Sequence, residues 1–158
     1  MLTHGPWAAT PDLRHGFLDA ADSAPGPWEP TLARLGIPLP IVVPRQVHGT
    51  RVVEAAGGTP PEADAVVTAM PGLLVGVVTA DCVPVLLVDA ARRAGGAVHA
   101  GWRGMAAGVL ESALDVLRQR FGVEPRAVEA VIGPAVGGCC YEVGPEVRDA
   151  FRVRIGSS

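Results

Sequence analysis

Two histidines and one cysteine stand where short apolar segments end, and these residue types bind metals. His48 precedes Gly49, His99 lies two residues before Gly101, and Cys82 lies between two Val-rich segments. Strand ends beside loops are where open sheets place functional residues. Two imidazoles and one thiolate that converge would form a metal site with one open position, which is typical of catalytic zinc. These donors favour zinc or copper over magnesium and calcium.

Each of these residues also has a purely structural interpretation. A cysteine between Val-rich strands is commonly an inert core residue, and a histidine at a strand end commonly makes hydrogen bonds within a turn. His48 and Cys82 are 34 residues apart, and Cys82 and His99 are 17 apart. Such spacings do not by themselves bring the three side chains together, so both interpretations stay open.

Charged neighbours of the three residues are candidates for substrate binding and proton transfer. Arg45 and Arg103 each lie within a few residues of a candidate ligand, and guanidinium groups bind phosphate through paired hydrogen bonds. The alternative for both is a structural ion pair with Asp64, Asp81 or Glu142. Asp81 directly precedes the cysteine and is a candidate to orient an imidazole or to act as a general acid, unless strand alternation turns it away.

The adjacent cysteines Cys139 and Cys140 form a separate group with Tyr141. Because the chain has 3 cysteines and two of them are adjacent, a disulfide framework is not expected. We expect Cys139 and Cys140 to lie in the core or in a pocket wall. Tyr141 is a candidate for lining the site.

Short Val-rich segments punctuated by Gly or Pro predict the strands that position these residues. The predicted strands cover 41–43, 51–54, 64–69, 73–79, 84–89, 96–99 and 128–132. The four between 64 and 99 are expected to be central strands buried on both faces, and 128–132 is expected to be buried too. Apolar residues at helical spacing predict one long helix over 104–121, capped by Gly122, and a second helix over 145–152.

Composition limits the class of protein. The chain has 158 residues, of which 49% are hydrophobic and 18% charged, so it is expected to fold as one globular domain. A net charge of −3 without a basic cluster argues against nucleic acid as a partner. The longest uncharged run, 65–80, is split by Pro71 and Gly72, so no membrane span is expected. The N-terminus lacks the pattern of a secretory signal, which predicts a cytoplasmic protein.

Four motifs in a fixed order carry a resemblance to a known family. They read RQVHG at 45–49, TADCVPVL at 79–86, HAGWRG at 99–104 and IGPAVGGCCYEVG at 132–144. Over about 43–151 the chain resembles the YfiH-like proteins. That family was long described as multicopper polyphenol oxidases or laccase-domain proteins and is now understood as purine nucleoside phosphorylases.

The resemblance implies both a fold and an activity. The implied fold is α/β (α+β), with mixed β-sheets in a four-layer α/β/β/α arrangement related to toxin-type deamidases. The implied zinc ligands are His48, Cys82 and His99. The implied reaction converts adenosine, inosine, guanosine or methylthioadenosine and phosphate to the free base and ribose 1-phosphate or its methylthio analogue. Deamination of adenosine to inosine is implied as a second reaction.

The sequence departs from the family pattern near both ends. The early segment His15-Gly16-Phe17 continues differently from that of the relatives, and the usual C-terminal strand, helix and Arg- and Gly-rich segment are not in this sequence. We therefore expect 1–158 to be a single YfiH-like domain that lacks this segment. The apolar faces of 128–132 and 147–151 would then be exposed, so the chain is expected to form a homo-oligomer or to be one piece of a longer polypeptide.

Three other functions compete with phosphorolysis. Four histidines are too few for a multicopper oxidase, but two His, one Cys and an axial Met70 or Met105 would satisfy a single blue-copper centre. A cysteine hydrolase or deamidase would use Cys82 as nucleophile and His99 as base. A domain that binds metal without catalysis is the third alternative.

Overall fold

A five-stranded mixed sheet forms the centre of the computed structural model, which describes residues 1–19, 28–37, 40–55 and 62–155. Its strand order is β2-β3-β6-β5-β7. Only the β2–β3 pair is parallel, and the other three pairs are antiparallel. The strands are β2 (Val52–Glu54), β3 (Ala65–Thr68), β5 (Val83–Asp89), β6 (Gly95–Ala100) and β7 (Val128–Ile132).

Alternation along the central strands produces two apolar layers. In β3, Ala65 and Val67 face one core cluster, whereas Val66 faces the other. The first cluster contains the helix residues Ala113 and Leu117, both fully buried. This is the double burial that the Val-rich sequence predicts for central strands.

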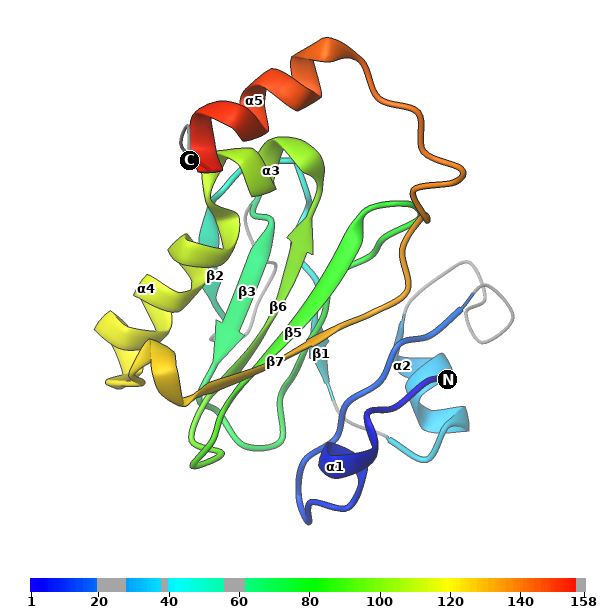
Figure 1. The fold of residues 1–158 in the computed structure, drawn as a ribbon. Coiled ribbons are helices and arrows are strands. Elements are labelled where there is room, and N and C mark those ends of the chain that lie inside the picture. The colour runs from blue at the N-terminus through cyan, green and yellow to red at the C-terminus, as the bar shows by residue number, and fades with distance from the viewer. Residues whose placement is uncertain (20–27, 38–39, 56–61, 156–158) are drawn as a thin grey trace.

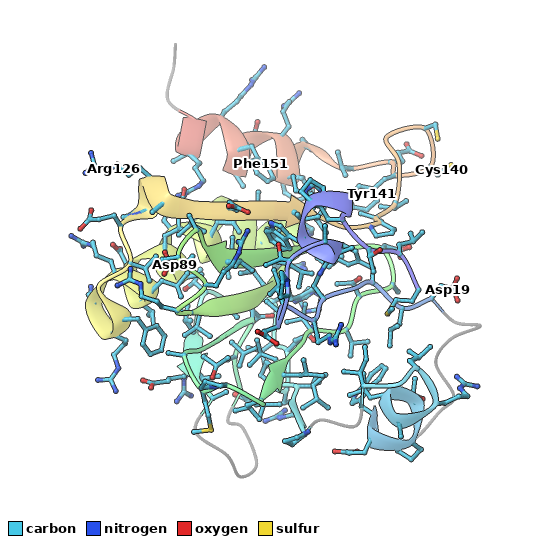
Figure 2. The ribbon with its side chains drawn as sticks, turned by 90° about the horizontal axis from the view of Figure 1, so that it is seen from below. Asp19, Asp89, Arg126, Cys140, Tyr141 and Phe151 are labelled. Carbon is cyan, nitrogen blue, oxygen red and sulfur yellow. The ribbon has the colours of Figure 1, made fainter. Side chains whose placement is uncertain are left out.

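Helices and a second, smaller sheet cover the two faces. Strands β1 (Ile41–Val42) and β4 (Leu74–Val75) pair in parallel, and Val42 and Val75 belong to the second cluster. Figures 1 and 2 show α2 (Trp28–Arg34) on the side away from α4 (Val109–Phe121). The remaining helices are α1 (Gly5–Ala8), α3 (Trp102–Ala107), α5 (Pro145–Ile155) and the 3-10 turn η1 (Pro125–Ala127). The chain therefore has the mixed α/β architecture expected for it.

The long helix expected over 104–121 is two helices. Gly108 separates α3 from α4 and has a φ of +96°, which is left-handed backbone that interrupts a right-handed helix. The predicted cap at the other end is confirmed, because Gly122 has a φ of +65° and its N–H donates to the carbonyl of Arg118.

Two strand predictions were wrong in extent or burial. The segment 73–79 contains only the two-residue strand β4, and the chain then leaves the sheet toward Cys82. Strand β7 lies at the sheet edge, where Ile132 is 71% exposed. The expected apolar exposure is confirmed for Ile132 but not for Val147, which is buried.

The N-terminal segment is fixed to this edge strand. Trp7 in α1 is 1% exposed, and its Nε1–H donates to Glu129 Oε2 in β7. Arg92 Nη1 lies 3.1 Å from the same oxygen, and these two partners lower the pKa of the Glu129 carboxyl. Within the described residues, no helix combines the length and hydrophobicity needed to cross a bilayer.

Candidate metal centre

His48, Cys82 and His99 meet at one end of the sheet. Their ligand atoms all lie within 4.8 Å of one another, and the two imidazole rings are perpendicular with centroids 4.7 Å apart. His99 is buried, Cys82 is half-buried and His48 is exposed, so the group opens to solvent on the His48 side. The convergence expected from the motifs is therefore observed.

Strand register explains how Cys82 and His99 come together. Strands β5 and β6 pair antiparallel, with Val83 opposite Ala100 and Pro84 opposite His99. Cys82 immediately precedes this ladder, so it lies beside Gly101, just after β6. The two ligand positions thus sit on adjacent ends of one hairpin.

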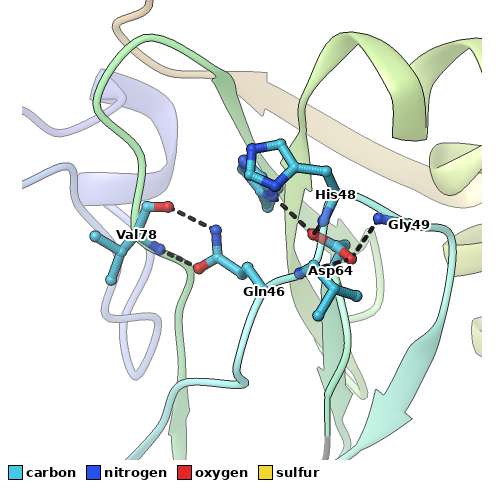
Figure 3. Close-up of polar contacts among 7 residues, drawn as sticks. Gln46, His48, Gly49, Asp64 and Val78 are labelled. Atoms are coloured by element: carbon cyan, nitrogen blue, oxygen red, sulfur yellow. Dashed lines mark hydrogen bonds and ion pairs between the residues drawn. The ribbon is translucent and has the colours of Figure 1, made fainter.

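Asp64 holds both histidines in place (Figure 3). Its Oδ1 accepts hydrogen bonds at 2.8 Å from His99 Nδ1 and from the His48 backbone N–H, and its Oδ2 accepts one at 2.7 Å from the Gly49 N–H. A weaker bond comes from the Val47 N–H at 3.3 Å. Because Nδ1 of His99 is committed to Asp64, only Nε2 remains for a metal.

The loop conformation at His48 depends on the same carboxylate. His48 has a φ of +60°, a left-handed conformation that few non-glycine residues adopt. Asp64 stabilises this conformation by accepting hydrogen bonds from the consecutive backbone N–H groups of His48 and Gly49. Burial alone would raise the pKa of Asp64, but the bonds from His99 and the backbone outweigh it, so the pKa lies below its usual value.

Asp64 is the functional residue that the sequence interpretation missed, since it was considered only as an ion-pair partner for arginine. The signal available was a carboxylate directly before the three apolar residues 65–67, where an unpaired charge would be costly to bury. Asp81, a candidate to orient an imidazole or to act as a general acid, is exposed in the bend before β5. Its carbonyl accepts the Val136 N–H, and its role in proton transfer stays a prediction.

The other predicted residues lie outside this cluster. Arg45 forms an ion pair with Glu62, not with any of the three partners considered from the sequence. The Arg103 guanidinium stacks 4.4 Å from the centroid of the Trp102 ring at the start of α3. Both arginines are exposed, and their contact with phosphate stays a prediction.

Cys139, Cys140 and Tyr141 lie on the exposed loop between β7 and α5. Figure 2 shows Cys140 on this loop at the periphery of the molecule. The expectation that the two cysteines are core or pocket wall was wrong, because Gly137 to Cys140 form an exposed turn closed by the Cys140 N–H and the Gly137 carbonyl. Tyr141 is also exposed, and its place in a substrate site stays a prediction.

The donor set and the space around it fit a metal ion. A tetrahedral zinc ion would hold these donors about 3.3 to 3.6 Å apart, so the side chains must close by only about 1 Å. Without a cation, burial raises the pKa of the Cys82 thiol, and the charges of Asp81 and Asp64 raise it further. A bound cation reverses this effect, because it favours the thiolate.

Gly101 leaves room for the three ligands. A Cβ at this position would lie 3.1 Å from His48 Cδ2, 3.2 Å from Cys82 Sγ and 3.6 Å from His99 Cε1. The backbone of Gly101, with φ −68° and ψ 157°, is open to any residue, so a larger side chain would act on the site through space and not through the backbone.

Replacing Gly101 by alanine should therefore lower zinc affinity by at least about 10-fold while the backbone stays the same. Chelator competition measures the affinity. The matched control is Gly138→Ala, because a Cβ there meets nothing within 4 Å. Equal zinc affinities in the two variants would contradict the packing seen around Gly101.

Comparisons with known proteins identify the family of the chain. A family model described as multi-copper polyphenol oxidoreductase laccase matches residues 17–157. A purine nucleoside phosphorylase of Pseudomonas aeruginosa is 49% identical over 106 residues, which are 67% of this chain and 42% of the relative. The purine nucleoside phosphorylase YfiH of Escherichia coli is 44% identical over 108 residues, which are 67% of this chain and 43% of the relative.

Comparison with solved structures leads to the same family. A Bacillus licheniformis hypothetical protein YfiH superposes with a TM-score of 0.72 at 33% identity, over 78% of this chain and 51% of that one. A Neisseria meningitidis protein superposes with a TM-score of 0.70 at 41% identity, over 79% of this chain and 50% of that one. The chain spans about half the length of the curated relatives described above. By sequence and by fold, the chain belongs to the laccase-domain family that includes the YfiH proteins.

Proposed function

We propose that this chain carries the metal centre of a zinc-dependent purine nucleoside phosphorylase, with copper as the alternative ion. The observation that carries the proposal is the convergence of His48, Cys82 and His99 in a chain whose relatives are named purine nucleoside phosphorylases. The proposed substrates are phosphate and adenosine, inosine, guanosine or methylthioadenosine. The products are the free base and ribose 1-phosphate or methylthioribose 1-phosphate, and deamination of adenosine is the proposed side reaction.

Residues of this chain have distinct proposed roles. His48, Cys82 and His99 hold the ion, which when bound would supply a Lewis acid at the solvent-facing side of the group. Asp64 keeps the His99 ring in one orientation through Nδ1.

The proposed substrate contacts come from residues outside the group of three candidate ligands. Arg45 and Arg103 bind phosphate, since both guanidinium groups are exposed. Asp81 transfers a proton and Tyr141 contacts the nucleoside. Phosphorolysis depends on positioning phosphate and stabilising the leaving purine, and these are tasks for fixed cations and hydrogen-bond donors.

We also propose a cytoplasmic protein that binds neither nucleic acid nor membranes. The free thiols of Cys82, Cys139 and Cys140 support a reducing compartment, and the net charge of −3 argues against nucleic acid. The exposed edge strand β7, with Ile132 on it, is the proposed surface for a homo-oligomer.

The direct test is phosphate-dependent release of hypoxanthine from inosine by the chain, after intact-mass verification. We expect release that requires both phosphate and zinc and that stops on chelation. Stoichiometric zinc without any release would support the metal centre but would assign catalysis to a longer polypeptide. Release that is independent of phosphate would contradict phosphorolysis.

The hydrogen bond between Asp64 and His99 supports a second candidate function. Cys82, His99 and Asp64 have the residue types of a nucleophile, a base and an orienting carboxylate, as in cysteine hydrolases and deamidases. The raised pKa of Cys82 works against it, because an activated cysteine has a lowered pKa. Covalent labelling of Cys82 in metal-free protein, with turnover that survives chelation, would favour this function.

A single blue-copper centre has less support. Met70 follows β3, whereas Asp64 and the ligands lie at the other end of that strand, about 13 Å or more away at the usual rise per residue. Met105 packs against the core cluster that contains Ala113 and Leu117. An intense visible absorption band on addition of copper would support a blue-copper centre.

A further inference from the structure

The two ligand segments that carry His48 and Cys82 leave the same pair of strands. Strands β1 and β4 run parallel, with Val42 opposite Val75, and the backbone pairing ends where the Gly76 N–H donates to the Val42 carbonyl. His48 follows Val42 by six residues and Cys82 follows Val75 by seven. Both segments therefore run side by side toward the metal centre beyond the last backbone bond.

The side chain of Gln46 bridges these segments (Figure 3). Its Nε2 donates to the Val78 carbonyl at 2.7 Å, and its Oε1 accepts the Val78 N–H at 2.7 Å. One primary amide thus satisfies both backbone groups of Val78, as a neighbouring strand would. In the part of the chain that the structure describes, these are the hydrogen bonds that join 43–50 to 76–83.

Asp64 does not perform this task. It fixes His48 to His99, but it accepts no hydrogen bond from the segment that carries Cys82. That segment is otherwise held by the pairing of Val83 with Ala100 in β6 and, from the other side, by the Val136 N–H to Asp81 and the Gly133 N–H to Pro84. Gln46 therefore provides the direct hydrogen-bonded link between the segment that carries the His48 imidazole and the segment that carries the Cys82 thiol.

We propose that Gln46 is a positioning residue for the metal centre, which sets the approach of Cys82 to His48 and so the affinity and geometry of the bound ion. The inference rests on the metal centre proposed above. It deepens that proposal by adding a residue that is not one of the three candidate ligands. Outer residues that orient ligands typically change metal affinity by about 10- to 100-fold.

The test replaces Gln46 by methionine, which has a similar length but cannot make either hydrogen bond. The control is Gln119→Met, because Gln119 is the same residue type, exposed on α4 and remote from the ligands. Zinc affinity is measured by chelator competition, cobalt spectra report the thiolate ligand, and hydrogen exchange reports the Val78 amide in metal-free protein.

We expect Gln46→Met to bind zinc about 10-fold more weakly. It should also shift the cobalt–thiolate band and expose the Val78 amide to exchange, while its melting temperature stays close to that of the control. A wild-type affinity and an unchanged cobalt spectrum would overturn the role of Gln46. A loss of affinity that merely follows a lower melting temperature would overturn it as well. If the wild-type chain itself shows no cobalt–thiolate band, the metal centre fails rather than the role of Gln46.

Discussion

Replacing Cys82 by alanine should abolish zinc retention and phosphorolysis together. Cys82 supplies the single thiolate of the group, and its Sγ lies within 4.8 Å of the two imidazole donors. Loss of a direct ligand should cost more than the roughly 100-fold change in affinity that follows loss of a supporting residue. Elemental analysis of the purified variant, together with the inosine assay, measures both effects.

The matched controls are Cys139→Ala and Cys140→Ala. Both cysteines are exposed on the loop before α5, away from the three-ligand group, so both variants should keep zinc and activity. Undiminished zinc in Cys82→Ala would contradict the ligand assignment. Zinc loss in either control would instead place the metal at the adjacent thiols.

Replacing Asp64 by asparagine should have the second largest effect, on the free energy of unfolding and on zinc affinity at once. The carboxylate is fully buried and accepts hydrogen bonds from the His99 ring and from three consecutive backbone N–H groups. An asparagine keeps only one acceptor oxygen, and its NH2 group would face N–H groups that need an acceptor. We expect a loss of about 3 kcal/mol in the metal-free protein and a fall in zinc affinity of about 10- to 100-fold.

Asp89 provides a control that separates these two effects. It is also a buried aspartate, it is paired with Arg93, and it lies at the far end of β5 from Cys82. Asp89→Asn should therefore lower the free energy of unfolding, whereas the zinc affinity of the folded protein should stay close to that of the wild type. Denaturant unfolding and chelator competition on both variants provide the comparison. Equal changes in zinc affinity would show that Asp64 acts only through general stability.

The convergence of the three candidate ligands was predictable from the sequence because each stands in a motif that carries the family resemblance. His48, Cys82 and His99 were expected to converge, and they do. The contact of Asp64 with the histidines was not predicted, because it depends on strand register. Strand β3 pairs with β6 so that Ala65 lies opposite Val98, and this places Asp64 beside His99. Long-range register of this kind is set by the packing of both sheet faces and does not appear in local spacing.

Helix and strand limits were less predictable for a similar reason. The apolar pattern over 104–121 continues through Gly108, and an isolated glycine does not by itself end a helix. The apolar composition of 128–132 also predicted a buried strand, yet β7 is an edge strand in this chain. Whether a Val-rich strand is central or at an edge depends on its neighbours in the sheet.

The most direct test of the metal centre is X-ray absorption on the zinc-loaded chain at one equivalent of metal. The ligand group predicts one sulfur at about 2.3 Å and nitrogen or oxygen ligands at about 2.0 to 2.1 Å. The sulfur signal should persist in Cys139→Ala, whereas Cys82→Ala should retain no zinc that could give a signal. Zinc bound to no sulfur, or to two sulfurs from the adjacent thiols, would contradict a centre built from His48, Cys82 and His99.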